Sequence, residues 1–170
     1  MVYLSKSKVQ NIHARYCESL NESRPIYPIY FFNLCYYEKL STLADDCDAI
    51  FGDVVVDVND GRYLYKFFGV GNIFGSLKIQ YTKIEGLDFL LGLDFVGSLD
   101  ASQTPVLIRS NNYLKQAFLL LNNIISANND QLVMYDNPSL FLNNQQCLMY
   151  QIDFDIKMDY RDCRPYIYDN

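Results

Sequence analysis

The sequence contains a series of short segments in which apolar and polar residues alternate, and this pattern limits the possible folds more than any other feature. The clearest runs are residues 77–82 and 148–158, where every second side chain is apolar. Strict alternation predicts strands with one buried face. Residues 87–95 and 104–109 predict two further strands. We therefore expect a sheet protein with few helices.

Residues 53–68 consist of two β-rich runs around Asn59, Asp60 and Gly61, which predicts a hairpin. Two segments have apolar residues at helical spacing. Residues 40–51 predict a helix that ends at Gly52, and residues 113–127 predict a longer one capped by Ser110 or Asn111. Residues 9–20 also show helical spacing, although a strand is possible there.

The segments follow one another without a strand–helix–strand rhythm and without an internal repeat. The expected class is therefore α+β, a single domain with a mostly antiparallel sheet and two or three helices. We expect residues 1–36 to form an extended, weakly basic N-terminal segment. Residues 37–170 are expected to form the single core domain.

Three glycines, Gly69, Gly71 and Gly75, resemble a phosphate-binding loop at first sight. Such a loop needs G-x-G-x-x-G between a strand and a helix, so that the helix N-terminus faces the phosphates. Here the third glycine is one residue too late, and a predicted strand follows it. We therefore expect these glycines to allow a bend or bulge between strands.

The residues needed for a catalytic or metal site are scarce. His13 is the only histidine, so a serine or cysteine nucleophile would have almost no base to activate it. The aspartates at 45, 46 and 48 lack the glycine and glutamate of a calcium loop, and those at 153, 155 and 159 are typical of the solvated face of a strand. We expect no enzyme, no cofactor and no metal.

The five cysteines are an odd number, and none of them belongs to a CxxC motif. The first ten residues lack the apolar stretch of a signal peptide, and no run is long enough to span a membrane. The sequence therefore predicts an intracellular protein whose cysteines are reduced thiols.

Charge is arranged in blocks along a chain whose net charge is −6. Residues 40–60 contain six aspartates and no base, whereas residues 61–84 contain four bases and no acid. These bases, Arg62, Lys66, Lys78 and Lys83, alternate with aromatic residues. Such blocks are often ordinary surface composition, but they also fit complementary faces that bind other macromolecules.

The order of elements resembles that of a rhabdovirus matrix protein of the short, plant-infecting type. The resemblance is carried by four segments in sequence: "EKLSTLADDCDAIF", "RYLYKFFGVGNIFGSLK", "LDFLLGLDFVGSLDASQTPVLIR" and "NNYLKQAFLLLNNII". It is a likeness of pattern without a diagnostic motif and covers residues 37–127. It implies a virion structural protein that self-associates, condenses the nucleocapsid and bridges it to the envelope membrane during budding.

The same resemblance implies partners and sites. The partners would be further copies of the chain, the viral nucleoprotein–RNA complex, the inner face of an anionic membrane and host budding factors. Arg62, Lys66, Lys78 and Lys83 would contact nucleocapsid or lipid. Tyr27, Pro28 and Tyr30, within "YPIY", resemble a budding motif. The protein would lie in the virion and at the cytoplasmic membrane periphery of the host cell.

Two other functions are compatible with the residues. One is a small intracellular adaptor or inhibitor whose acidic face neutralises a basic partner, as immunity proteins do. The other is an enzyme with a site that a single sequence does not reveal.

Overall fold

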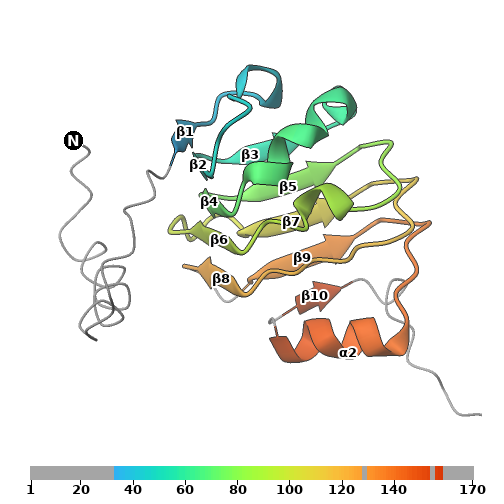
Figure 1. Cartoon of the computed structure of the whole chain (residues 1–170). Helices are drawn as coiled ribbons and strands as arrows, with labels where there is room; N and C mark the ends of the chain where they lie inside the picture. Colours follow the sequence, from blue (N-terminus) through green and yellow to red (C-terminus); the bar gives the residue numbers. More distant parts are fainter. Residues whose placement is uncertain (1–32, 128–129, 154–155, 159–170) are drawn as a thin grey trace, which may run out of the picture. The chain divides into compact units, whose positions relative to one another are not determined.

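Short strands in the described part of the chain form two sheets in which every neighbouring pair is parallel (Figure 1). The structure is a computed structural model that describes residues 33–127, 130–153 and 156–158. All of these residues belong to one compact unit, Phe32–Asn170.

Each sheet has five strands. Sheet A consists, in spatial order, of β1 (Leu34–Tyr36), β2 (Ala49–Phe51), β4 (Asn72–Phe74), β6 (Phe95–Ser98) and β8 (Asn123–Ser126). Sheet B consists of β3 (Val54–Val56), β5 (Leu77–Gln80), β7 (Val106–Arg109), β9 (Leu132–Tyr135) and β10 (Ile156–Met158).

The chain winds in coils, each of which passes from a strand of sheet A to a strand of sheet B and returns along a third side. The third side carries three 3₁₀ helices, η1 (Leu40–Thr42), η2 (Gly61–Gly69) and η3 (Asp88–Leu90), with irregular segments between them. Figure 1 shows the coils stacked on one another, with α2 (Asn144–Asp153) beside β10 at the end of the stack. Because each coil repeats the path of the one before, equivalent strands run in the same direction.

The core lies inside the coils and is built from columns of equivalent side chains. In sheet A, Ile50 is opposite Ile73, and Ile73 is opposite Val96. In sheet B, Val54, Leu77, Val106 and Leu132 form one fully buried column, and Val56, Ile79, Ile108 and Met134 form a second. β-Branched and leucine side chains suit such columns because they fill a pleated, dry interior.

Glycine forms the corner between the two sheets in two successive coils. Gly52 follows β2 with φ 128°, and Gly75 follows β4 with φ 153°. A Cβ on Gly75 would lie 2.1 Å from the backbone oxygen of Gly52, so the coils approach one another too closely there for any side chain. The expected bend between strands is thus confirmed at Gly75.

A second repeated turn follows the strands of sheet B. Tyr81, Ser110 and Asp136 each come directly after a strand and have φ near 55°. The residue after each of them is buried and polar, namely Thr82, Asn111 and Asn137. These side chains bond to one another and to backbone groups of neighbouring coils, which satisfies the polar groups of the turns.

The predicted α+β class with a mostly antiparallel sheet is wrong. Both sheets are parallel throughout, and short helical turns, rather than long helices, cover the third side. The coils repeat the same path through the two sheets, although the sequence analysis found no internal repeat. The hairpin predicted at 53–68 is also wrong, because this segment contains strand β3 followed by the helix η2.

The helix predicted at 113–127 is an extended segment that leads into β8. Ala117, Leu119 and Leu121 are buried while Phe118 and Leu120 are exposed, which is the alternation of an extended chain. The helix predicted at 40–51 is η1 followed by β2. The strand predicted at 148–158 is mostly α2, and only its last residues form β10.

The strands predicted within 77–82 and 104–109 are confirmed as β5 and β7. The segment predicted at 87–95 is η3 followed by the start of β6. The segment 9–20 lies outside the described residues. The division of the chain into residues 1–36 and 37–170 stays a prediction.

Candidate functional site

The outer surface of sheet A presents a group of exposed apolar side chains that we call the aromatic face. It consists of the exposed residues Leu34, Tyr36, Phe51, Phe74 and Ile125 together with the half-buried Phe95. Alternation along each strand places these residues outward while their neighbours point into the core. The register aligns Tyr36, Phe51 and Phe74 in one row across three coils.

The rings of the aromatic face contact one another. The centroids of Tyr36 and Phe51 are 5.6 Å apart, and those of Phe74 and Phe95 are 5.5 Å apart. The row continues from Phe74 to Gly97, where a Cβ would lie 2.6 Å from the ring of Phe95. The Phe95 ring therefore occupies the space that a side chain at position 97 would need.

Much of this apolar surface is open to solvent, since Tyr36 is 68% exposed, Phe51 39% and Phe74 40%. Monomeric proteins seldom leave a contiguous aromatic surface uncovered, and such patches mark sites of contact with other molecules. Aromatic groups at the centre of an interface contribute a large share of its binding free energy.

Polar groups border one side of the aromatic face, just before its strands begin. Asp48 accepts a hydrogen bond from the backbone N–H of Asn33, and Asp94 accepts one from the side-chain amide of Asn122. The two carboxylates make this border negative. The arrangement therefore fits a partner with apolar side chains and neighbouring positive charge.

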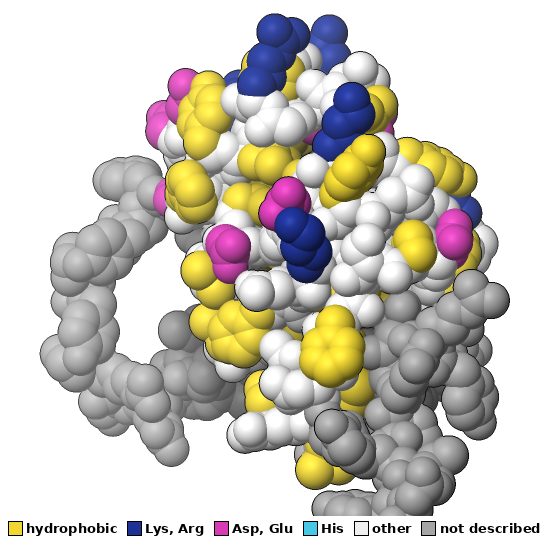
Figure 2. Space-filling model, turned by 90° about the vertical axis from the view of Figure 1, so that its right-hand side faces the viewer, with side chains coloured by type: hydrophobic (Ala, Val, Ile, Leu, Met, Phe, Trp, Pro, Cys, Tyr) yellow, Lys and Arg dark blue, Asp and Glu magenta, His cyan; other side chains and the backbone are white. Residues whose placement is uncertain are grey.

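The four predicted binding bases lie on different elements rather than on one pair of strands. Arg62 and Lys66 belong to η2, Lys78 to β5, and Lys83 to the segment after β5. The view in Figure 2 shows Lys and Arg side chains mainly at one end, with acidic and hydrophobic groups interspersed below them. A role for these bases at a binding surface stays a prediction.

Lys66 is a buried structural lysine, only 7% exposed. Its ammonium group donates to the backbone oxygens of Leu43 and Ser41 and lies 3.3 Å from a carboxylate oxygen of Asp45. These contacts hold η2 against the segment that follows η1. Arg62, by contrast, is exposed and stacks on the neighbouring ring of Tyr63, 4.8 Å from its centroid.

Lys78 belongs to a polar network on the outer surface of sheet B. Its ammonium group donates to Gln103, whose amide donates to Asp53, and Asp53 also accepts from the hydroxyl and N–H of Ser76. Burial alone raises the pKa of Asp53, but the hydrogen bonds from Ser76 and Gln103 outweigh it and leave the pKa below its ordinary value. The network fixes the corner of two coils.

Tyr27, Pro28 and Tyr30 lie outside the described residues. Among the residues that the structure describes, no group of His, Cys, Asp and Glu is arranged to hold a metal ion. None of the described helices has both the length and the apolar character needed to cross a membrane.

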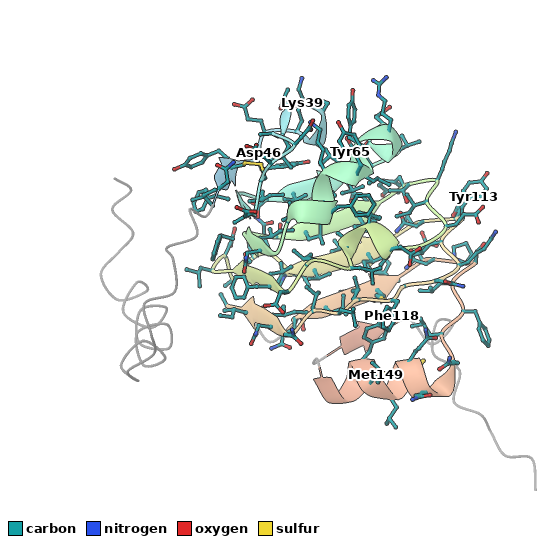
Figure 3. All side chains as sticks on the ribbon, viewed as in Figure 1. Lys39, Asp46, Tyr65, Tyr113, Phe118 and Met149 are labelled. Atoms are coloured by element: carbon teal, nitrogen blue, oxygen red, sulfur yellow. A yellow bond between two sulfur atoms is a disulfide. The ribbon has the colours of Figure 1, made fainter. Side chains whose placement is uncertain are left out.

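Two of the cysteines expected to be reduced are joined instead. Cys35 in β1 and Cys47 before β2 form a disulfide, which is the yellow bond beside Asp46 in Figure 3. Cys147 is also disulfide-bonded. Disulfides persist in oxidising compartments, such as the exterior of the cell, and are rare in the cytosol.

Sequence reasoning missed the aromatic face. It assigned Phe51 to the buried side of a helix and did not single out Tyr36 or Phe74. A signal was nevertheless present, because the tripeptide Ile-Phe-Gly occurs twice, at residues 50–52 and 73–75. In both copies the isoleucine is buried, the phenylalanine is exposed and the glycine forms the corner.

In a comparison with protein families, the Receptor L domain matches residues 46–153, which is more than half of the chain. No curated protein matches the chain. Receptor L domains are non-enzymatic ligand-binding domains of receptor ectodomains. This agrees with the expectation of a protein that is not an enzyme.

The match corrects the other functional predictions. The resemblance to a rhabdovirus matrix protein is wrong, and with it the roles in virion assembly and budding. The alternative of an intracellular adaptor or inhibitor is also wrong. The predicted nucleoprotein, membrane and host budding partners are wrong, and so is the predicted location in virion and cytoplasm, because Receptor L domains are ligand-binding domains of receptor ectodomains.

Proposed function

Since this chain belongs to the Receptor L domain family, we propose that it is a ligand-binding module of a receptor ectodomain and that the aromatic face is its binding surface. The observation that carries this assignment is the exposed row Tyr36, Phe51 and Phe74, which crosses three coils of sheet A. No other described surface aligns exposed rings in this way on regular backbone.

The physical argument for this surface is its combination of rigidity and apolar area. Each ring stands on a strand whose inward neighbour is packed in the core, so binding costs little additional ordering of the backbone. Aromatic side chains lose little rotamer freedom and bury a large area when a partner covers them. The row also crosses three strands, which suits a polypeptide better than a small molecule.

The expected ligand is a polypeptide that presents aromatic or aliphatic side chains beside Lys or Arg. The apolar part would cover the rings, and the basic part would lie over Asp48 and Asp94 at the border. Binding should therefore weaken moderately with added salt, because only the charged border is screened.

The proposal can be tested with a displayed library of random peptides selected on the wild-type protein. We expect the enriched peptides to combine apolar and basic residues. A selected peptide should bind the Phe51→Ser and Phe74→Ser variants at least about tenfold more weakly, because truncating a central ring removes about 2 kcal/mol of binding free energy. Fluorescence anisotropy of the labelled peptide measures the change.

Phe68→Ser is the matched control, because Phe68 is an exposed phenylalanine of η2 on the third side of the coils. Its affinity for the peptide should equal that of the wild type. Tyr36→Ser provides a further test at a more exposed ring, where loss of folding is not expected. Equal peptide affinity in the Phe51, Phe74 and Tyr36 variants would show that another surface binds.

A further inference from the structure

Among the strands that the structure describes, β3 is a free edge of sheet B, because it pairs only with β5. Sheet A continues for one more strand at this end, β1, and none of the described strands of sheet B is its counterpart. The edge consists of three consecutive valines, Val54–Val56. An uncharged, β-branched strand whose outward backbone groups are unpaired is a template for pairing with another chain.

The backbone groups of this edge alternate in direction. The N–H of Val54 donates to Ser76 O at 2.7 Å, toward β5. The N–H groups of Val55 and Asp57 therefore face away from the sheet, where a further strand would pair with them.

Both of these N–H groups already have side-chain acceptors. The N–H of Val55 donates to the hydroxyl oxygen of Tyr37 at 3.3 Å, and that hydroxyl donates to the backbone oxygen of Val55 at 2.6 Å. The N–H of Asp57 donates to the Asp60 carboxylate at 2.9 Å. Two side chains thus make the bonds that a neighbouring strand would otherwise make.

Tyr37 is held in this position by the first coil. Its N–H donates to Phe51 O at 2.9 Å, which extends the β1–β2 pairing by one residue. The corner beside it is Gly52, where a Cβ would lie 3.3 Å from the Cβ of Tyr37. Burial raises the pKa of the Tyr37 hydroxyl, which keeps the hydroxyl protonated and able to donate.

The edge is only partly open, because η1 of the first coil contacts β3. A hollow of about 420 Å³ lies beside it, and its lining includes Tyr37, Val55, Asp57 and Asp60. Lys39, at the top of Figure 3, marks this end of the molecule. The hydrogen bonds of Tyr37 and Asp60 therefore occupy the outward N–H groups of β3 at an edge that the first coil covers only in part.

We propose that Tyr37 and Asp60 are stoppers on the free edge of sheet B, which prevent β3 from pairing with β3 of a second copy of this chain. A second copy is the natural occupant, since two identical edges related by a two-fold axis can pair antiparallel along the same three valines. Asp57 and Asp60 add repulsion between two such edges, because they bring like charges together.

Amide hydrogen exchange tests the first part of the proposal. In the wild type, the Val55 amide should exchange as slowly as that of Val54, although it lies on a free edge. In Tyr37→Phe, which keeps the ring and removes the hydroxyl, Val55 should exchange at least about tenfold faster while Val54 is unchanged. Fast exchange of Val55 in the wild type would overturn the proposal without the need for any variant.

Sedimentation tests the second part. The double variant Tyr37→Phe/Asp60→Ala should form dimers at concentrations where the wild type does not, and more so in high salt. Adding Val55→Pro to this background should restore the wild-type state, because proline has no N–H to donate. Tyr113→Phe, which removes an exposed hydroxyl elsewhere, should behave as the wild type. A folded double variant that sediments like the wild type would contradict the role of the stoppers.

Discussion

Asn111 is the residue on which several coils depend. Its side-chain amide donates to Ile79 O and to the side chain of Asn137, each at 3.0 Å, and its oxygen accepts from the N–H and the hydroxyl of Thr82. It is fully buried. Since water cannot reach these groups, each needs a protein partner, and one asparagine provides partners in two neighbouring coils.

We therefore predict that Asn111→Ala lowers the free energy of unfolding by about 2 to 3 kcal/mol, because it leaves buried donors and acceptors unpaired. Urea unfolding followed by circular dichroism measures the change. Asn112→Ala is the matched control, since Asn112 is exposed, and it should alter stability by less than about 0.5 kcal/mol. Equal effects of the two substitutions would contradict this account.

For single residues, the sequence indicated the type of side chain but not whether that side chain is exposed or buried. The bases of residues 61–84 were visible as a charged block, yet Lys66 is buried against carbonyl groups while Lys83 is exposed. A cluster of charged residues in the sequence does not indicate which of these residues are buried in the folded protein. The aromatic face was missed for the same reason, since Phe51 and Ile50 are equally apolar in sequence.

The corners between the two sheets require glycine where successive coils approach closely. Gly75 joins β4 to β5 with positive φ, and a Cβ there would collide with the backbone of Gly52 in the previous coil. Backbone atoms of a stacked coil cannot move aside as a flexible side chain can.

We predict that Gly75→Ala destabilises the protein by at least about 2 kcal/mol, since it combines an unfavourable φ with a steric clash. Gly61→Ala is the control. A Cβ on Gly61 would have no atom within 4 Å, and the substitution should change stability by less than about 1 kcal/mol, with stabilisation favoured. Thermal unfolding of the two variants measures the difference, and a Gly75→Ala variant as stable as the wild type would refute the argument.

The elements predicted correctly are those in which alternation spans a whole strand, such as β5 and β7. The failures have two causes. Strands of three or four residues are too short for their period to be distinguished from that of a helix, as residues 40–51 show. The direction of pairing is not encoded in a strand's own pattern, and a turn signal such as Asn59–Gly61 suggested a hairpin where η2 begins.

In the whole molecule, each coil contacts mainly its neighbours, so that an end coil depends on few other contacts. The first coil is attached to the second by the β1–β2 pairing and by the disulfide between Cys35 and Cys47, which are 12 residues apart. The disulfide also fixes the segment from which Tyr37 reaches the edge of sheet B.

We predict that the double variant Cys35→Ser/Cys47→Ser loses about 3 kcal/mol of stability, mainly because the unfolded chain is no longer constrained. Amide exchange should rise most in β1 and the residues up to β2, while β7 keeps its protection. Dithiothreitol should reproduce the added exchange in the wild-type first coil and cause no further change there in the variant. Full protection of β1 in the variant would contradict the prediction.

The class of the molecule was difficult to predict because, apart from the two copies of Ile-Phe-Gly, the repeat is structural. Equivalent positions such as Ile73 and Val96 share only size and burial, and the return segments between them differ in length and in secondary structure. The thiol state was inferred from an assumed compartment, whereas the closeness of Cys35 and Cys47 follows from the parallel pairing of β1 with β2.

Alternation along the strands of sheet A has a consequence for evolution. Phe51 and Phe74 project outward while Ile50 and Ile73, their neighbours in sequence, hold the coils together. Mutations can therefore replace the exposed rings one at a time without altering the buried side chains that stabilise the coils. A duplicated gene could acquire a new specificity in this way without first having to become a new fold.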